Sequence, residues 1–242
     1  MGESPVGGNR KMRSLILDNA LIIVIAAALV ELFVGISVLA FRGRRKTYGA
    51  MRAFIAILCF GLFYDAFIIA IGKLIGDGNI LWVLSIARFL LSAILIPFLF
   101  PISGYAADFG KKGMRVMKLL MLLFIVLGLT HTVMTEIKAV EFAGLLRYSS
   151  TDATPKWAVI LSGIINLLSI LPLLIIGVRL VIVKHNIALL LSGLCMLAFT
   201  IIAPVTGNMD LMVFFSMIGE ALMVFFMFVH AQTAKDPEFS LS

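Results

Sequence analysis

Hydrophobic residues fill this chain in long blocks, and short polar stretches separate one block from the next. A helix that crosses a bilayer needs about 20 mostly apolar residues, and seven segments meet that length. These segments are residues 19–41, 50–72, 79–101, 115–136, 157–181, 187–205 and 209–230. The pattern predicts an all-α integral membrane protein that folds as a seven-transmembrane-helix bundle.

The composition agrees with this fold class and predicts one domain. Of the 242 residues, 62% are hydrophobic and 14% are charged, whereas soluble domains carry about 25% charged residues. We expect a polar N-terminal tail (1–18), a single transmembrane domain (19–230) and a short C-terminal tail (231–242). The first span is too long for a signal-peptide core and lacks a small-residue cleavage site after it, so it should be retained. The connections are too short for a folded soluble domain, so any chemistry must lie between the helices or at the membrane surface.

The net charge of +7 predicts the orientation in the membrane. The basic residues lie beside the ends of the predicted helices and not on a separate domain, so the bilayer is an expected partner and nucleic acid is not. With the N-terminus outside, twelve basic residues face the cytoplasm and seven face the other side. Basic residues prefer the cytoplasmic side, which favours an N-terminus outside and a cytoplasmic C-terminus, although Arg10, Lys11 and Arg13 favour the reverse.

One outer connection, residues 137–157, is long enough to have structure of its own. It begins with Val140, Phe142, Leu145 and Leu146 and then becomes a polar turn. We expect a short amphipathic helix on the outer surface, with the polar turn after it. A connector that covers the bundle is favoured over a gating lid.

Five strongly polar side chains interrupt the apolar spans, one in each of five helices. They are Glu31, Asp65, Arg88, Asn166 and Glu220. At 1.5 Å per residue and with the N-terminus outside, all five lie about 10 to 18 Å below the outer boundary. They therefore share one layer of the membrane, and ionisable residues at such depth mark functional sites by default.

Further polar residues accompany this layer and are expected to support it. They are Tyr64, Ser85, Ser92, Ser162 and Ser216. Four of them share a helix face with a residue of the layer; Tyr64 is next to Asp65 in sequence but about 100° around the helix from it. Charged faces should point into the bundle, because exposure to lipid costs several kcal/mol.

The charges within the layer require compensation. Three carboxylates and one arginine give a formal charge of −2, so either one or two carboxyls carry protons or a cationic ligand is bound. Arg88 should pair with Asp65, because a short connection makes their helices antiparallel neighbours. A purely structural alternative is an ion pair with protonated carboxyls that hold the helices together, at about 0.6 to 2 kcal/mol for each contact.

Metal, cofactor and hydrolase chemistry are not predicted. Glu31, Asp65 and Glu220 offer oxygen ligands, but the three histidines lack metal-site spacing, and no G-x-S-x-G elbow is present. Arg88 followed nine positions later by Pro97 resembles the third helix of microbial rhodopsins. That resemblance would imply an acidic counter-ion near Leu91 and a retinal-binding lysine in the region of Glu220, so the residue types exclude a retinal Schiff base.

Three functions are compatible with these features. The first is a cavity that binds a small molecule or lipid-like ligand, with possible proton-coupled transport, in which Glu31 or Glu220 carries the proton. The second is an intramembrane enzyme that modifies lipids or isoprenoids with paired carboxyls as acid and base. The third is a seven-helix sensor or structural subunit without turnover. No catalytic residue is assigned.

Overall fold

The computed structural model describes residues 19–40, 46–206 and 211–233. Its elements, in chain order, are α2 (Ala20–Ala40), α3 (Lys46–Ile75), α4 (Asn79–Leu95), η1 (Ile96–Phe98), α5 (Leu99–Ala106), α6 (Lys111–Met134), β1 (Ile137–Phe142), β2 (Leu145–Ser150), α7 (Lys156–Lys184), α8 (Ala188–Thr206) and α9 (Met212–Thr233). The predicted N-terminal tail lies outside the described residues. So does most of the C-terminal tail, since α9 continues only to Thr233.

Six stretches of the described chain are long and apolar enough to cross a membrane. Four of them are the single helices α2, α6, α7 and α9. The other two are most of α3 and the continuous stretch formed by α4, η1 and α5. The sixth predicted span, 187–205, is also helical and forms α8, but its apolar part over residues 188–202 is shorter than the other six. These lengths fit a mainly helical, multi-pass membrane protein.

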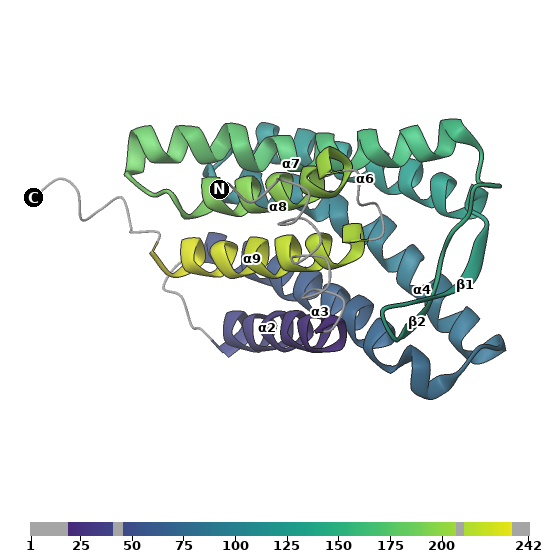
Figure 1. The fold of residues 1–242 in the computed structure, drawn as a ribbon. Coiled ribbons are helices and arrows are strands. Elements are labelled where there is room, and N and C mark those ends of the chain that lie inside the picture. The colour runs from purple at the N-terminus through teal and green to yellow at the C-terminus, as the bar shows by residue number, and fades with distance from the viewer. Residues whose placement is uncertain (1–18, 41–45, 207–210, 234–242) are drawn as a thin grey trace, which may run out of the picture.

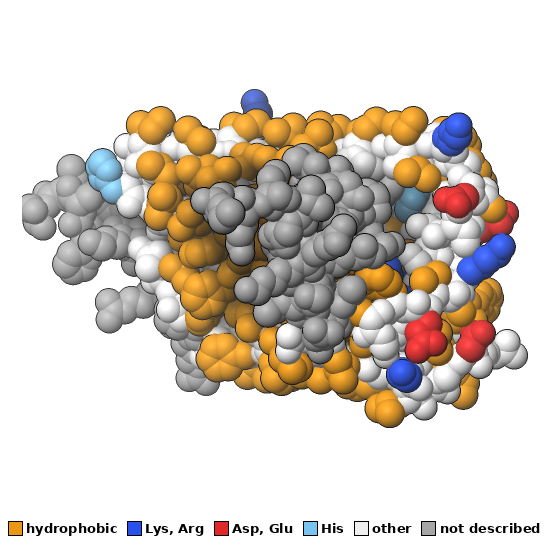
Figure 2. All heavy atoms as spheres, in the orientation of Figure 1, with side chains coloured by type: hydrophobic (Ala, Val, Ile, Leu, Met, Phe, Trp, Pro, Cys, Tyr) orange, Lys and Arg blue, Asp and Glu red, His pale blue; other side chains and the backbone are white. Residues whose placement is uncertain are grey.

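The long helices pack side by side around an apolar core. Figure 1 shows α7, α8, α9 and α2 lying next to one another, with the β1–β2 hairpin at the end of the bundle where α7 begins. Leu58, Ile102, Leu173 and Met227 are among the fully buried side chains where α3, α5, α7 and α9 meet. Many large hydrophobic side chains are exposed. In Figure 2 hydrophobic side chains gather along the upper and lower edges of the described surface, whereas most of the visible charged side chains lie at its right end, as expected of a protein whose sides are in contact with lipid.

The third predicted span contains a break that the sequence pattern did not predict. It begins at Asn79 as expected, but η1 separates α4 from α5. Pro97 lies within η1. Proline has no backbone N–H and its ring clashes with the carbonyl group four residues earlier, so the helix tightens there into a 3₁₀ turn.

The connection between α6 and α7 is a β-hairpin, so the prediction of a surface helix was wrong. β1 and β2 pair antiparallel from Ile137–Ser150 to Phe142–Leu145. The two residues between the strands, Ala143 and Gly144, have φ angles of 51° and 75°. Positive φ at both central residues makes a tight hairpin turn that matches the strand twist. The spacing of Val140 and Phe142 fits the two-residue period of a strand better than a helix.

The hairpin lies on the C-terminal end of α3 and on the start of α9. A Cβ atom at Gly72 of α3 would collide with the Leu146 carbonyl oxygen, so only glycine lets the strand approach this closely. The Phe142 ring packs 6.1 Å from that of Phe214. These contacts fix the hairpin over the layer of buried polar residues.

Candidate functional site

An ion pair between α3 and α4 forms the centre of the candidate site. Arg88 Nε lies 3.1 Å from Asp65 Oδ1, and the two side chains are 6% and 24% exposed. Residues 76–78 join the two helices, which pack against each other. The pairing predicted from the sequence is confirmed.

Arg88 has further contacts, but they do not use all of its donors. Nη2 donates a hydrogen bond to the Tyr148 carbonyl oxygen at 2.9 Å, and the guanidinium carbon lies 5.0 Å from the centre of the Phe89 ring. Nη1 is buried and has no hydrogen-bond partner. A buried donor without an acceptor costs about 1 to 3 kcal/mol, so Nη1 favours an added acceptor oxygen.

A cavity of about 780 Å³ lies beside the ion pair. Its volume falls within the range of small-molecule sites, about 300 to 1,000 Å³. Five of the predicted residues line this one cavity: Asp65, Arg88, Ser92, Ser162 and Asn166. The remaining lining comes from α4, α6, α7, α8, the start of α9, and the end of the hairpin with the turn that follows it.

Six polar residues on the cavity wall were not predicted. They are His131, Thr132, Thr135, Ser150, Thr154 and Thr200. For α6 the sequence does carry a signal, because its last turn concentrates polar residues in an otherwise apolar helix. Thr135 Oγ1 lies 3.3 Å from His131 Nε2. Ser150 and Thr154 were missed because the sequence assigned them to a polar turn on the outer surface.

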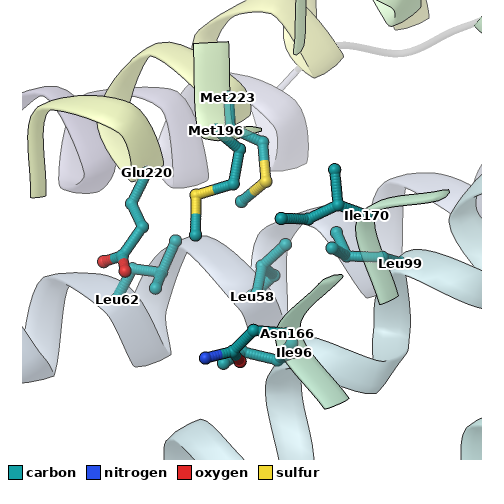
Figure 3. A pocket seen from close by; sticks show the side chains of 9 residues that line it. All are labelled: Leu58, Leu62, Ile96, Leu99, Asn166, Ile170, Met196, Glu220 and Met223. Carbon is teal, nitrogen blue, oxygen red and sulfur yellow. The ribbon is translucent and has the colours of Figure 1, made fainter. Parts of the chain in front are cut away.

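A second, much smaller cavity has both Asn166 and Glu220 in its lining. Figure 3 shows Glu220 and Asn166 at its edge, with the Met196 and Met223 thioethers among the apolar side chains around it. Its volume is about 20 Å³, which is room for one water molecule. Asn166 lines both cavities. Glu220 Oε1 accepts a hydrogen bond from Ser216 Oγ at 2.8 Å.

Glu31 is the most deeply buried carboxyl group of the layer. Its residue is 1% exposed, and neither side-chain oxygen has a hydrogen-bond partner. It is close enough to Glu220 and Asp65 for their charges to interact. The structure therefore brings Glu31 together with the other predicted carboxyls, although Glu31 does not line either cavity.

Three predicted supporting residues, Tyr64, Ser85 and Ser216, line neither cavity. The Tyr64 hydroxyl donates to the Leu84 carbonyl oxygen at 3.1 Å and so ties α3 to α4. Ser85 is buried, and its hydroxyl has no hydrogen-bond partner. Ser92 lines the large cavity while donating to the carbonyl oxygen of Arg88, one turn earlier.

Tyr148 links the hairpin to the connection between α3 and α4. Its hydroxyl donates to Asp77 Oδ1 at 2.8 Å, while its carbonyl oxygen receives the bond from Arg88. The hydrogen bond to Asp77 raises the pKa of Tyr148, and the negative charge of Asp77 adds to the shift. Two hydrogen bonds of Tyr148 therefore hold strand β2 beside the Asp65–Arg88 ion pair.

The described residues contain no cluster of three or more His, Cys, Asp or Glu side chains that could hold a metal ion. Comparison of the sequence with models of protein families and with curated proteins finds no match. Functional conclusions therefore rest on the geometry of the site.

Proposed function

We propose that this protein is a seven-span membrane protein that binds a small ligand in the 780 Å³ cavity through Arg88. One observation carries the proposal: the Asp65–Arg88 pair forms part of the wall of a ligand-sized cavity, and Arg88 Nη1 has no partner. A pair that only held two helices together would not require space of this size beside it. The guanidinium group suits ligand oxygens such as those of a carboxylate or phosphate.

Proton uptake accompanies the binding of an anion in this proposal. The three carboxyl groups of Asp65, Glu31 and Glu220 outnumber Arg88 and Arg147, the two arginines whose charges act on Asp65. An added anion is therefore accommodated more readily when a carboxyl group gains a proton. Glu220 is the proposed carrier, because Asn166 lies on both its small cavity and the ligand cavity. Glu31 is the second proposed proton carrier, because neither oxygen of its carboxyl group has a hydrogen-bond partner. The affinity for an anion then rises as the pH falls.

The charges at the two ends of the bundle support an outer position for the hairpin. Among the described side chains, the hairpin end carries four basic and four acidic residues, whereas the opposite end carries seven basic residues and one acidic residue. Basic residues accumulate on the cytoplasmic side. We therefore place the hairpin, and the end of the bundle that carries it, on the outer side of the membrane, with α8 as the seventh crossing.

Binding of butyrate and inorganic phosphate to the purified full-length chain tests this function. We expect at least one of the two anions to raise the melting temperature, and Arg88→Gln to weaken its binding about tenfold or more because a charge-assisted hydrogen bond is lost. Arg179→Gln is the matched control, since it removes an exposed arginine far from the cavity lining. Equal binding by wild type and Arg88→Gln would refute the role of Arg88.

Flux measurements in liposomes test the coupling to protons. A pH-dependent anion or proton flux should vanish in Glu220→Gln and persist in Glu141→Gln, which changes an exposed carboxyl group of the hairpin. Flux that survives Glu220→Gln would remove that residue from the mechanism. Mass spectrometry of membrane lipid after incubation distinguishes the enzyme alternative, because a chemically changed lipid would indicate turnover.

A further inference from the structure

The large cavity is open on the side where α7 faces the outer end of α8 and the start of α9. Four apolar residues of its lining are also exposed at the protein surface, by between 38% and 56%: Val159, Leu167, Ile201 and Met212. They lie on the membrane-spanning helices α7, α8 and α9 and not on the hairpin. These four residues give the opening a side that faces the hydrocarbon of the bilayer, and the exposed Ser150 of the hairpin adds a polar edge to it.

The packing of α7 against α8 explains why the opening lies there. At their inner ends the two helices touch closely, since a Cβ atom at Gly177 would lie 2.6 Å from the Leu190 Cα. Further out, Gly163 is an exposed cavity residue, and nothing lies within 4 Å of a Cβ atom built on it. α8 is ten residues shorter than α7, so the outer turns of α7 extend beyond it.

The charged residues of the cavity lining, Arg88 and Asp65, come from α4 and α3. The lining from α7 and α8 is mainly apolar, through residues such as Leu167, Ile170 and Leu197, although Ser162, Asn166 and Thr200 also belong to it. From Val159 to Ile170 the lining follows α7 for about 17 Å at 1.5 Å per residue. A ligand that fills this space presents an oxygen-bearing head to Arg88 and an apolar chain to α7 and α8.

Resting on the function proposed above, we infer that the ligand is a single-chain carboxylate amphiphile that enters from the bilayer between α7 and α8. A headgroup alone would leave the apolar lining of the cavity in contact with water, whereas the chain of a lipid-like ligand covers that lining.

Photolabelling with a diazirine-bearing lauric acid tests this inference on the full-length chain in nanodiscs. We expect cross-links on cavity residues such as Leu197 and Ile170, identified by mass spectrometry. Gly163→Trp should reduce them about fivefold or more, because an indole occupies the opening. The open space beside Gly163 lets the variant fold. Gly49→Trp is the matched control, since it alters an equally open helical glycine that does not line the cavity.

The outcomes separate this inference from the proposed function. Labels spread over the lipid-facing surface, or cavity labels that Gly163→Trp leaves unchanged, would overturn lateral entry of an amphiphile. If butyrate nevertheless binds in an Arg88-dependent manner, the inference fails while the proposed function stands. If the labelled lauric acid, butyrate and phosphate all fail to bind through Arg88, both the inference and the proposed function are wrong.

Discussion

Arg88 has contacts with two other parts of the chain, since it pairs with Asp65 of α3 and bonds to Tyr148 of the hairpin. A side chain with both roles contributes to stability as well as to binding. The two contributions can be separated, because removing one partner of a buried pair leaves the other charge uncompensated, whereas neutralising both does not.

Single and double substitutions of the ion pair should therefore differ. Arg88→Gln is expected to lower the free energy of unfolding by up to about 3 kcal/mol. This loss is smaller than for a fully buried ion pair, because water reaches part of the Asp65 side chain. Asp65→Asn combined with Arg88→Gln should recover most of that stability while ligand binding stays lost. Thermal unfolding and butyrate binding measure the two effects. Full binding by the double variant would show that the pair is only structural.

Replacing Glu31 should stabilise the fold, whereas replacing Arg88 should destabilise it. Both of its carboxyl oxygens are buried without a hydrogen-bond partner, so an apolar side chain of similar size avoids their desolvation. Glu31→Leu should raise the free energy of unfolding by about 1 to 2 kcal/mol and weaken the pH dependence of anion binding. Denaturation monitored by circular dichroism would check this. A destabilised Glu31→Leu would contradict it.

At the scale of the elements, the seven predicted segments all form helices, because crossing a bilayer imposes a length and an apolar composition that are visible in sequence. The break at Pro97 and the hairpin depend on local backbone geometry, and the hairpin was mistaken for a helix. The Asp65–Arg88 contact could be predicted from a short connection. The contribution of α6 to the cavity could not be predicted from the sequence, because it depends on which helices pack against one another in the folded protein.

The hairpin should respond to alkaline pH through Tyr148. The pKa of its hydroxyl is raised above the ordinary 10.0, so this bond supports the folded hairpin at lower pH and is lost as the pH rises through the raised value. The difference in ultraviolet absorbance between wild type and Tyr148→Phe should give a midpoint above 10.0. In Asp77→Asn the midpoint should fall, because the negative charge is removed. An unchanged midpoint would mean that Asp77 does not act on Tyr148.

At the scale of the whole molecule, the position of α8 decides the topology. An N-terminus and a C-terminus on opposite sides of the membrane require an odd number of crossings, whereas six long spans alone would place both ends on one side. A C-terminus on the side opposite the hairpin requires α8 to cross, because α7, α8 and α9 follow the hairpin. The outer location of the hairpin is a separate prediction.

Labelling from each side of the membrane tests this topology. With Cys59 and Cys195 replaced by alanine, Glu141→Cys on the hairpin should react with an impermeant maleimide added outside, and a C-terminal reporter should be active only in the cytoplasm. A cysteine before residue 19 should react from outside as well. Both termini on one side would show that α8 does not cross.

The approach of the hairpin to Gly72 has a consequence for relatives of this protein. Alanine at position 72 would displace β2, and with it the carbonyl group that receives a bond from Arg88. In any homologue that keeps the hairpin, position 72 should therefore be glycine even though it lies within a helix, where glycine is unfavourable. A paired loss of this glycine and of the two-residue turn would then mark the branch of a family tree on which the hairpin disappeared.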